Sequence, residues 1–548
     1  MRNQPPVLLV ALMFAVLYVA EGLLFRAYSP DQYLLATAVL KTHEPAAFAG
    51  DLVWEGEGTG RYFSSGARWM MLLANEMTGE SLVEPVDWAL VWLPFCEVFF
   101  FSGTFLLARR FSKDDWACLL AACCFTVVRR AIWDGWGVGP VSTIDSKGVV
   151  SACCPLLLWF VLRFHRRLPQ LSIVFLGWGF LSNLHPTTGW GMTGALMLSW
   201  LLVERFSRGS WLRILAAGFA VLAGSLPSMI GLAGESGWSA WGAGGFPGDA
   251  GGFSVHALRG FLEDVSVPLL LALLGWVAWD RHPESENERE LKLIICFPLA
   301  VVLLSVVSLM PGFGCLRTEQ IKNFRLIYLV MPVWVAMAFS CWLQLQSESG
   351  RWVKWGVPLL AVLIALSGNL PGHRLVGLGW HLLGQRSDPL ARKVINRLND
   401  DAADLELAAW ARENTSKRSV FYFDSGEFRY FSRRPLVFCS DDRICLARSD
   451  GKIAGEWLCR REKISSLCRD GNTAGMWEMA REYHAHYLVI LMHWRPLPMR
   501  PVWANEKYVV YRVQNLFDRD REFDGMEPEN PEPSSGVITC QLGGGGRL

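Results

Sequence analysis

The chain has 548 residues, of which 52% are hydrophobic and 19% charged, and its mean hydropathy is positive at +0.24. Soluble domains carry about 25% charged residues, so this composition argues against a set of soluble domains and predicts a polytopic α-helical membrane protein. A net charge of +1 gives no basis for nucleic-acid binding. The 26 tryptophans fit membrane interfaces and also surfaces on which sugars stack.

Apolar segments flanked by charged or turn residues predict about eleven membrane spans. The first segment, residues 6–25, has about the 20 residues that a bilayer requires, and a cleaved signal peptide is its alternative interpretation. Several later segments are short, which suits either half-helices that line a polar cavity or tilted helices. The later spans lie at about 88–107, 116–128, 149–162, 171–182, 189–203, 214–232, 267–279, 293–310, 326–343 and 355–368.

Lysine and arginine are concentrated in the loops that follow every second span, and this asymmetry predicts a cytoplasmic N-terminus. An odd number of spans then places the C-terminal third outside, as in a multi-pass protein of a bacterial inner membrane. The predicted transmembrane domain is 1–368, with a large first outer loop at 26–86. The predicted inner loops are 108–115, 163–170, 204–213, 280–292 and 346–354.

Beyond about residue 370 the pattern changes from long apolar segments to alternating helices and strands. Residues 402–414 form an amphipathic helical pattern, and short runs rich in β-branched and aromatic residues follow it. We therefore expect a small extracytoplasmic α/β domain at 369–517. The charged, Pro- and Gly-rich residues 518–548 predict a disordered tail. The expected strands lie at about 419–424, 433–440, 486–492 and 506–513.

Cysteines and histidines of the C-terminal third give no defined metal site. The chain contains no CxxC pair, and the histidines of the run HAHYLVILMH, His484, His486 and His493, have no neighbouring acid that completes a ligand set. A divalent metal is therefore possible but is not supported by a clear set of ligands. Four cysteines of this region either pair or stay reduced, depending on the compartment: Cys439, Cys445, Cys459 and Cys468.

Two carboxylates follow the first span closely. Asp31 lies in the stretch SPDQY, about six residues after the span, and Asp51 follows a second helical stretch in AGDLVW. A helix-capping aspartate is one interpretation of Asp31, because Ser-Pro-Asp before an apolar-periodic run is an ordinary helix start. A catalytic acid held at the lipid surface is the other.

The order of these features resembles the GT-C superfamily of membrane glycosyltransferases, which take sugars from polyprenyl-phosphate donors. The similar features are a first span, an outer loop that opens on Asp31-Gln32-Tyr33, many further spans and an outer C-terminal α/β domain. An Asp-Glu pair is commoner at this place in that superfamily, and here Gln32 stands in the second position of the pair. The segment at residues 408–438 is also similar to the soluble domain of uncharacterised bacterial membrane proteins of this build.

The resemblance implies a transfer of sugar from a lipid-linked donor to an extracytoplasmic acceptor. Asp31 would then take the proton of the attacking hydroxyl, with Asp51 assisting or binding the acceptor. Cationic side chains on the same side would stabilise the departing polyprenyl phosphate. The candidates for substrate binding are Arg317, Lys322 and Arg325 in one outer loop, Arg129 and Arg130 in another, and His185 in the turn NLHPTTGW.

Simpler interpretations exist for each of these groups. The three basic residues at 317–325 would also serve as anchors at the lipid headgroups, and His185 would also serve in a helix-breaking turn. The segment GEFRYFSRRP, residues 426–435, either binds carbohydrate or anionic headgroups or packs the outer domain onto the spans. Two other functions compete with transfer: a transporter of lipid or solute, and a non-catalytic envelope scaffold of the same build.

Overall fold

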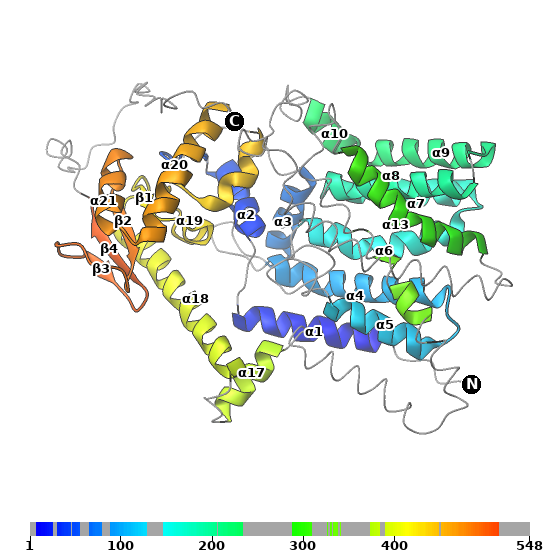
Figure 1. Ribbon diagram of the computed structural model, residues 1–548, viewed down its shortest axis with the longest axis horizontal. Coiled ribbons are helices and arrows are strands. Elements are labelled where there is room, and N and C mark those ends of the chain that lie inside the picture. The colour runs from blue at the N-terminus through cyan, green and yellow to red at the C-terminus, as the bar shows by residue number, and fades with distance from the viewer. Residues whose placement is uncertain are drawn as a thin grey trace. The chain divides into compact units, whose positions relative to one another are not determined.

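The structure is a computed structural model of the whole chain, and its elements fall into two compact units (Figure 1). The helical unit comprises Met1–Gln32 and Phe63–Asn396, and the mixed unit comprises Tyr33–Tyr62 and Arg397–Leu548. The chain passes between the units at three places, within α2, at residues 62–63, which lie outside the described residues, and within α18. The residues described are 7–25, 30–44, 47–54, 65–78, 88–128, 146–204, 206–233, 288–308, 326, 329–330, 332–337, 340, 373–383, 389–448 and 451–513.

The helical unit is built from apolar helices that pack side by side. Helix α4 contacts α1, α5 and α6, while α7 lies against α9 and α8 against α13. Three of these helices contain an internal proline, at Pro94, Pro155 and Pro298. The helices are α1 (Val7–Phe25), α3 (Ser65–Thr78), α4 (Trp88–Arg109), α5 (Asp115–Val128), α6 (Ser146–Phe164), α7 (Leu168–Ser182), α8 (Pro186–Glu204), α9 (Arg208–Gly224), α10 (Leu226–Ala233), α13 (Glu288–Ser308) and α17 (His373–Leu382).

Most predicted spans that fall on described residues coincide with one helix each, and one does not. The segment predicted at 214–232 is divided, because α9 ends at Gly224 and α10 begins at Leu226. Pro227 lacks the backbone N–H that a continuous helix would use at this point, which explains the division. The predicted spans at 267–279 and 355–368 lie outside the described residues, as does most of 326–343.

By length and composition, Ser146–Phe164 is the one helix among the described residues that could cross a bilayer, and Val7–Leu17 and Leu168–Ser182 are shorter apolar stretches. The number of spans and the orientation of the chain therefore stay predictions.

Loops that the sequence assigns to the inner side meet at the ends of three helices. Arg110, after α4, donates two hydrogen bonds of 2.6 Å to Glu290 in the first turn of α13. His165, after α6, lies with Nδ1 3.8 Å from the same carboxylate. The ends of α4, α6 and α13 are thus joined by polar contacts.

Asn183, in a loop that the sequence assigns to the outer side, contacts the break inside the predicted span 214–232 and also α3 of the first outer loop. Asn183, after α7, donates to the carbonyl of Gly224 at the end of α9 (2.9 Å) and accepts from the backbone of Ser228 (3.0 Å). A Cβ added to Gly66 in α3 would lie 2.5 Å from the Asn183 carbonyl oxygen, so α3 approaches this point closely. No predicted inner loop takes part in these particular contacts.

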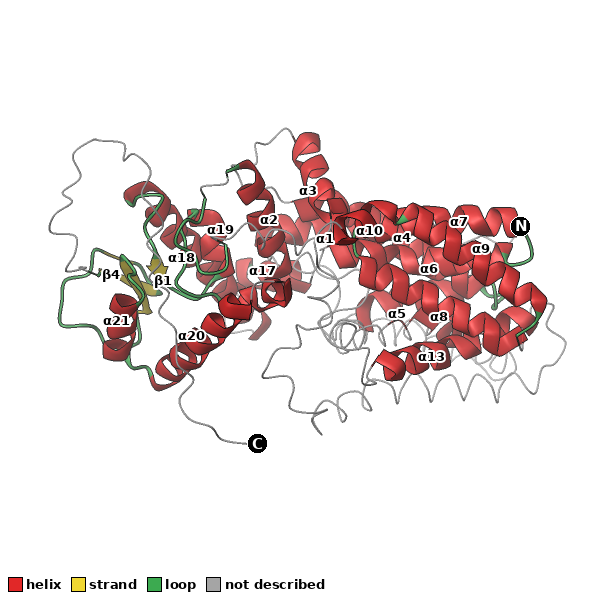
Figure 2. Cartoon of the chain, turned by 90° about the horizontal axis from the view of Figure 1, so that it is seen from above, coloured by secondary structure: helices red, strands yellow, loops and turns green. Residues whose placement is uncertain are grey.

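The mixed unit combines helices with a four-stranded sheet of order β1-β2-β4-β3. Strand β1 pairs parallel to β2, and β4 pairs antiparallel to both β2 and β3. All strands of the described part of the chain belong to this unit (Figure 2). Its elements are α2 (Pro30–His43), α18 (Pro389–Asn414), β1 (Phe421–Tyr422), α19 (Gly426–Ser432), a 3₁₀ helix η7 (Ser440–Arg448), α20 (Gly451–Asp470), α21 (Thr473–Glu482), β2 (Tyr487–Leu491), β3 (Trp503–Ala504) and β4 (Tyr508–Arg512).

An apolar core between α18 and the sheet holds the mixed unit together. Leu407 and Ala411 of α18 are buried against Phe421, Val489 and Val510 of the strands. Trp410 of α18 adds a stacked contact with Trp503, whose ring centroid is 5.5 Å away. The buried residues of α18 recur at helical spacing, so this long charged helix presents one apolar face to the sheet.

The prediction of a mostly helical chain with a small C-terminal α/β unit is confirmed. Strands form at 421–422, 487–491 and 508–512 as expected, whereas the segment 433–440 contributes a single bridge, from Leu436 to Phe421. Strand β3 was not expected. The predicted tail at 518–548 lies outside the described residues.

Candidate functional site

Asp31 is the second residue of α2, in the first turn of that helix. Helix α1 ends at Phe25 and α2 begins at Pro30, so Asp31 lies along the chain between an apolar helix and the folded mixed unit. An aspartate in the first turn interacts favourably with the helix dipole. Its side chain lies outside the described part of the structure, and both interpretations of Asp31 therefore stay predictions.

Asp51 lies in a turn after α2 and is buried inside the mixed unit, with 1% of the residue exposed. Its Oδ1 accepts from the backbone N–H groups of Val53 (3.2 Å) and Trp54 (3.3 Å), which closes the turn locally. Its Oδ2 accepts from the backbone N–H of Leu436 at 3.0 Å, more than 380 residues away in the sequence. Asp51 thus ties the first loop to the C-terminal part of the unit.

Arg429 of α19 lies between Asp51 and a second buried acid, Asp442. Its Nη1 and Nη2 donate to the two oxygens of Asp442 at 2.6 Å each, and its Nε lies 2.9 Å from Oδ2 of Asp51. The indole N–H of Trp54 donates to Oδ1 of Asp442 at 3.0 Å. We call these four residues, Asp51, Trp54, Arg429 and Asp442, the buried ion cluster.

The cluster satisfies its charges internally. Burial by itself would lower the pKa of Arg429, but Asp442 and Asp51 hold that pKa well above its ordinary value. Burial raises the pKa of the Asp442 carboxyl to about 6, and Arg429 acts against this rise. A bidentate pair between arginine and carboxylate is the geometry in which such buried charges are best compensated.

The carboxylate of Asp51 therefore stabilises the fold. Both of its oxygens are already bound by donors of the protein, and a general base requires an oxygen that reaches the substrate proton. The role of Asp51 in catalysis stays a prediction to which this geometry adds no support. Sequence reasoning missed the cluster, since no local pattern relates position 51 to positions 429 and 442.

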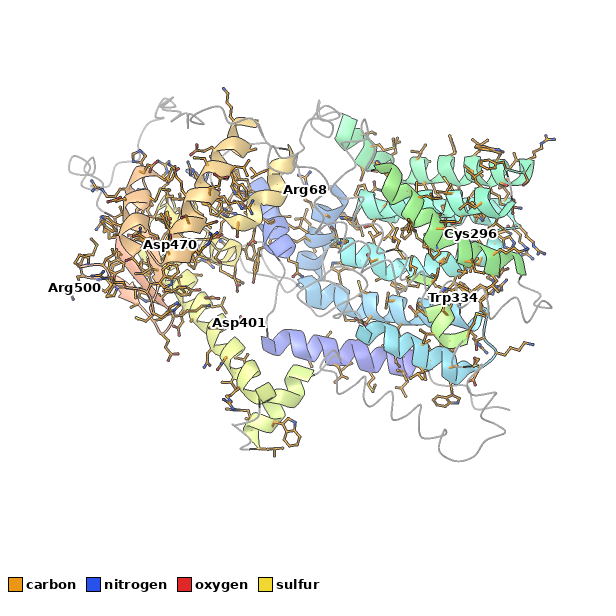
Figure 3. All side chains as sticks on the ribbon, viewed as in Figure 1. Arg68, Cys296, Trp334, Asp401, Asp470 and Arg500 are labelled. Atoms are coloured by element: carbon orange, nitrogen blue, oxygen red, sulfur yellow. The ribbon has the colours of Figure 1, made fainter. Side chains whose placement is uncertain are left out.

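The arginines of the segment 426–435 are also structural. Arg434 donates to the carbonyls of Arg412 and Thr415 at 2.7 Å each, where α18 ends. Burial and the neighbouring arginines, Arg412 and Arg433, lower the pKa of Arg434 to about 10. These contacts lie within the mixed unit, so both alternatives for this segment, ligand binding and packing of the outer domain onto the spans, stay predictions. Arg500 by contrast is exposed and lies at the periphery of the unit (Figure 3).

His185 lies in the turn between α7 and α8 of the helical unit. Its Nδ1 accepts from the backbone N–H of Thr188 at 3.3 Å and lies 2.9 Å from the Thr188 hydroxyl. This is the arrangement of a side chain that caps the first turn of α8. The helix-breaking turn thus has a direct structural basis, and substrate binding by His185 stays a prediction.

The remaining predicted phosphate-binding residues, Arg129, Arg130, Arg317, Lys322 and Arg325, lie outside the described residues. Within the described ranges, no group of three or more His, Cys, Asp or Glu side chains has a spacing that would hold a metal ion. His486 uses its Nδ1 to accept from the backbone of Val420 (3.1 Å).

The four C-terminal cysteines form no disulfide in the structure. Cys439 and Cys445 are buried, and Cys459 and Cys468 are half-buried. Burial raises the pKa of the thiols of Cys439 and Cys468.

No protein-family model matches the chain, and no curated protein matches it. Among solved structures, the chain is similar to the crystal structure of the Archaeoglobus fulgidus oligosaccharyltransferase in complex with zinc and sulfate. The similarity has a TM-score of 0.42 and 13% sequence identity, and it covers 88% of this chain and 67% of that chain. A likeness at this level carries no information on activity.

Proposed function

We propose that the chain is a membrane glycosyltransferase that moves a sugar from a polyprenyl-phosphate donor to an extracytoplasmic acceptor. Asp31 is the base of this reaction. The observation that carries the proposal is the position of Asp31, which opens α2 directly after the apolar helix α1 and immediately before the folded mixed unit. An acid at that place in the chain lies where a lipid-linked donor and a water-soluble acceptor would meet.

In the proposed reaction, Asp31 takes the proton of an acceptor hydroxyl as its oxygen attacks the anomeric carbon of the sugar. The bond between this carbon and the phosphate oxygen breaks, and the polyprenyl phosphate leaves with the electron pair. Arg317, Lys322 and Arg325 neutralise the phosphate, and the lipid tail stays in the bilayer. Arg129, Arg130 and His185 are further candidates for contact with the donor.

The proposed topology places the first loop and the C-terminal unit together on the outer side. Residues 33–62 belong to the same compact unit as residues 397–513, and the buried ion cluster joins them. Two segments that share a buried core cannot be separated by a bilayer, so the chain between them crosses any membrane an even number of times. Ten predicted spans after the first satisfy this condition.

The variant Asp31→Asn is expected to lose sugar transfer by about 10²-fold or more, because it removes a general base. Asparagine keeps the size of aspartate and removes only its favourable charge in the first turn of α2, worth about 0.3–1 kcal/mol, so the helix is expected to form. Transfer is measured with the full chain in lipid nanodiscs, by the release of polyprenyl phosphate from a panel of polyprenyl-phosphate hexoses.

Glu44→Gln is the matched control, since Glu44 is a second acid of the same loop and pairs with Arg433 at 3.5 Å near the surface. We expect this variant to transfer sugar at the rate of the unsubstituted chain. Transfer at an unchanged rate by Asp31→Asn would remove Asp31 as the base, and a complete absence of transfer by the unsubstituted chain would favour the envelope scaffold.

A further inference from the structure

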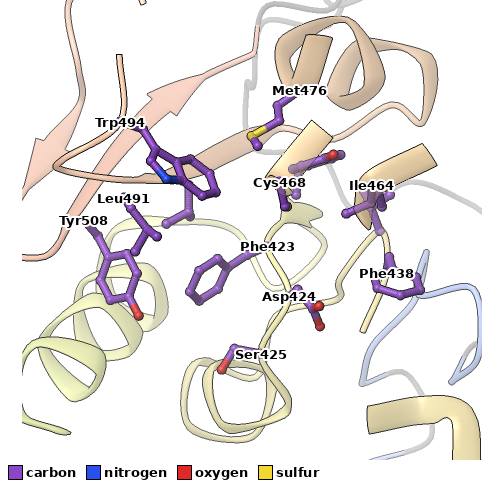
Figure 4. Close-up of a pocket in the computed structure, with 13 residues that line it drawn as sticks. Phe423, Asp424, Ser425, Phe438, Ile464, Cys468, Met476, Leu491, Trp494 and Tyr508 are labelled. Carbon is purple, nitrogen blue, oxygen red and sulfur yellow. The ribbon is translucent and has the colours of Figure 1, made fainter. Parts of the chain in front are cut away.

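The mixed unit contains a cavity of about 290 Å³ beside the carboxyl end of β1 (Figure 4). Its walls come from β1 and the loop after it, from β2 and β4, from the segment before η7, and from α20 and α21. This volume is at the lower end of the range of small-molecule sites, and it suits a single ring with its substituents. The cavity belongs to one compact unit and shares no residue with the buried ion cluster.

Most of the cavity wall is apolar and rich in aromatic side chains. Phe423, Trp494 and Tyr508 line it together with Leu491 and Met476. The rings of Phe423 and Tyr508 meet edge to face, with centroids 5.3 Å apart, so their positions are fixed by one another. Such a wall offers flat apolar surfaces to a ligand whose ring faces carry C–H groups.

One hydrogen-bond donor of the cavity has no partner among the described residues. Tyr422 is 5% exposed, and its hydroxyl makes no hydrogen bond with any other described residue. Burial raises the pKa of this hydroxyl, so it stays protonated at neutral pH. A buried hydroxyl without a partner is costly, and a ligand that supplies an acceptor removes this cost.

One acceptor of the cavity is also available. Asp424 is exposed at the cavity, and its Oδ1 accepts from the backbone N–H (2.7 Å) and the hydroxyl (3.0 Å) of Ser440. Its Oδ2 accepts no hydrogen bond from the part of the chain that is described. The carboxylate is thus held in place through one oxygen, and the other is open to a donor from a ligand.

The combination of these groups selects the chemistry of the ligand. An anion would meet the Asp424 carboxylate and no lysine or arginine among the lining residues. An ammonium ion would suit Asp424 and the aromatic rings, but it offers no acceptor to the Tyr422 hydroxyl. A hydroxyl group both donates and accepts, and a neutral sugar ring carries hydroxyls at its rim and C–H groups on its faces.

We propose that this cavity binds one neutral sugar unit, with Tyr422 donating to it, Asp424 accepting from it and the aromatic wall covering its apolar face. The proposal goes beyond the transfer reaction, because binding here requires neither Asp31 nor a lipid-linked donor. A loss of transfer in Asp31→Asn and a loss of binding in this cavity are therefore separate results.

Binding is tested by saturation-transfer NMR with the full chain in nanodiscs that contain no glycoside detergent. The probes are the methyl glycosides of glucose, mannose, galactose and N-acetylglucosamine, with tetramethylammonium as the cationic comparison. We expect at least one glycoside to bind. The variant Tyr422→Phe should weaken this binding about three- to tenfold, the effect of one hydrogen bond between neutral groups.

Tyr483→Phe is the matched control. The Tyr483 hydroxyl is likewise buried without a hydrogen-bond partner among the described residues, but Tyr483 does not line the cavity. This variant should bind the glycoside as the unsubstituted chain does. In both variants the buried thiol of Cys439 should be protected from labelling as in the unsubstituted chain, because neither hydroxyl stabilises the fold.

Three results would overturn the proposal. The first is the absence of binding for all four glycosides, and the second is binding of tetramethylammonium in their place. The third is an unchanged glycoside affinity in Tyr422→Phe, or a loss of Cys439 protection in that variant, which would give the hydroxyl a structural role.

Discussion

Replacement of Arg429 by alanine is expected to destabilise the mixed unit by about 3–5 kcal/mol, because it leaves Asp51 and Asp442 buried without their shared cation. All three side chains are about 1% exposed, so water does not replace the lost contacts. Unfolding is followed by the labelling of Cys439 and Cys445, which are both 0% exposed. Their equilibrium labelling should rise by about 10²- to 10³-fold, since each 1.4 kcal/mol is a factor of ten.

The variant Lys463→Ala is the control for the loss of one positive charge in the same unit. Lys463 pairs with Glu482 at 3.0 Å, but both side chains are more than 40% exposed. Surface pairs of this kind contribute about 0–1 kcal/mol, so labelling should change little. Equal labelling in the two variants would mean that the buried ion cluster does not hold the first loop in the unit.

Substitution of Gly179 by alanine is expected to disrupt the packing of α7 on α9 in the helical unit. A Cβ at this position would lie 2.4 Å from the backbone oxygen of Val221, and a Cβ at Gly224 would lie 2.4 Å from that of Leu176. Neither backbone can move without separating the helices. Overpacking of this kind costs about 1–3 kcal/mol, measured as a shift in the midpoint of unfolding in a denaturing detergent.

Gly177 provides a control two residues away on the same helix. A Cβ there meets no atom within 4 Å, so Gly177→Ala should leave stability unchanged or raise it by up to about 1 kcal/mol through helix propensity. A similar loss of stability in both variants would contradict this explanation. The glycines would then contribute through the flexibility of α7 and not through its close contact with α9.

Periodicity was enough to predict the apolar helices and most of the sheet, but not the separate helices α20 and α21. Apolar runs marked α4 to α8 to within a few residues, and the β-branched runs marked β2 and β4. Strand β3, Trp503–Ala504, was missed because two residues show no period, and the division at Ser225 was missed because the apolar character continues across it. Hydropathy indicates which segments are apolar, but it does not show that Pro227 removes a backbone hydrogen bond of the helix.

The sequence located polar residues of interest but not their partners. Asp51 was singled out for chemistry because it follows the first span, yet its partners Arg429 and Leu436 are nearly 400 residues away and depend on the tertiary fold. The cavity at Tyr422 and Asp424 was also missed. Its local signal is the run FYFD at residues 421–424, in which three aromatic residues precede an acid at the end of a strand.

The sidedness of the first loop and the C-terminal unit is the most direct test of this account. Alkaline phosphatase, which is active only outside the cytoplasm, is fused after residue 78 in one strain and after residue 548 in another. We expect both fusions to be active, because residues 33–62 and 397–513 share one folded unit, which the proposed topology places outside. Activity in only one of the two would contradict the account, since a bilayer would then separate Asp51 from Arg429.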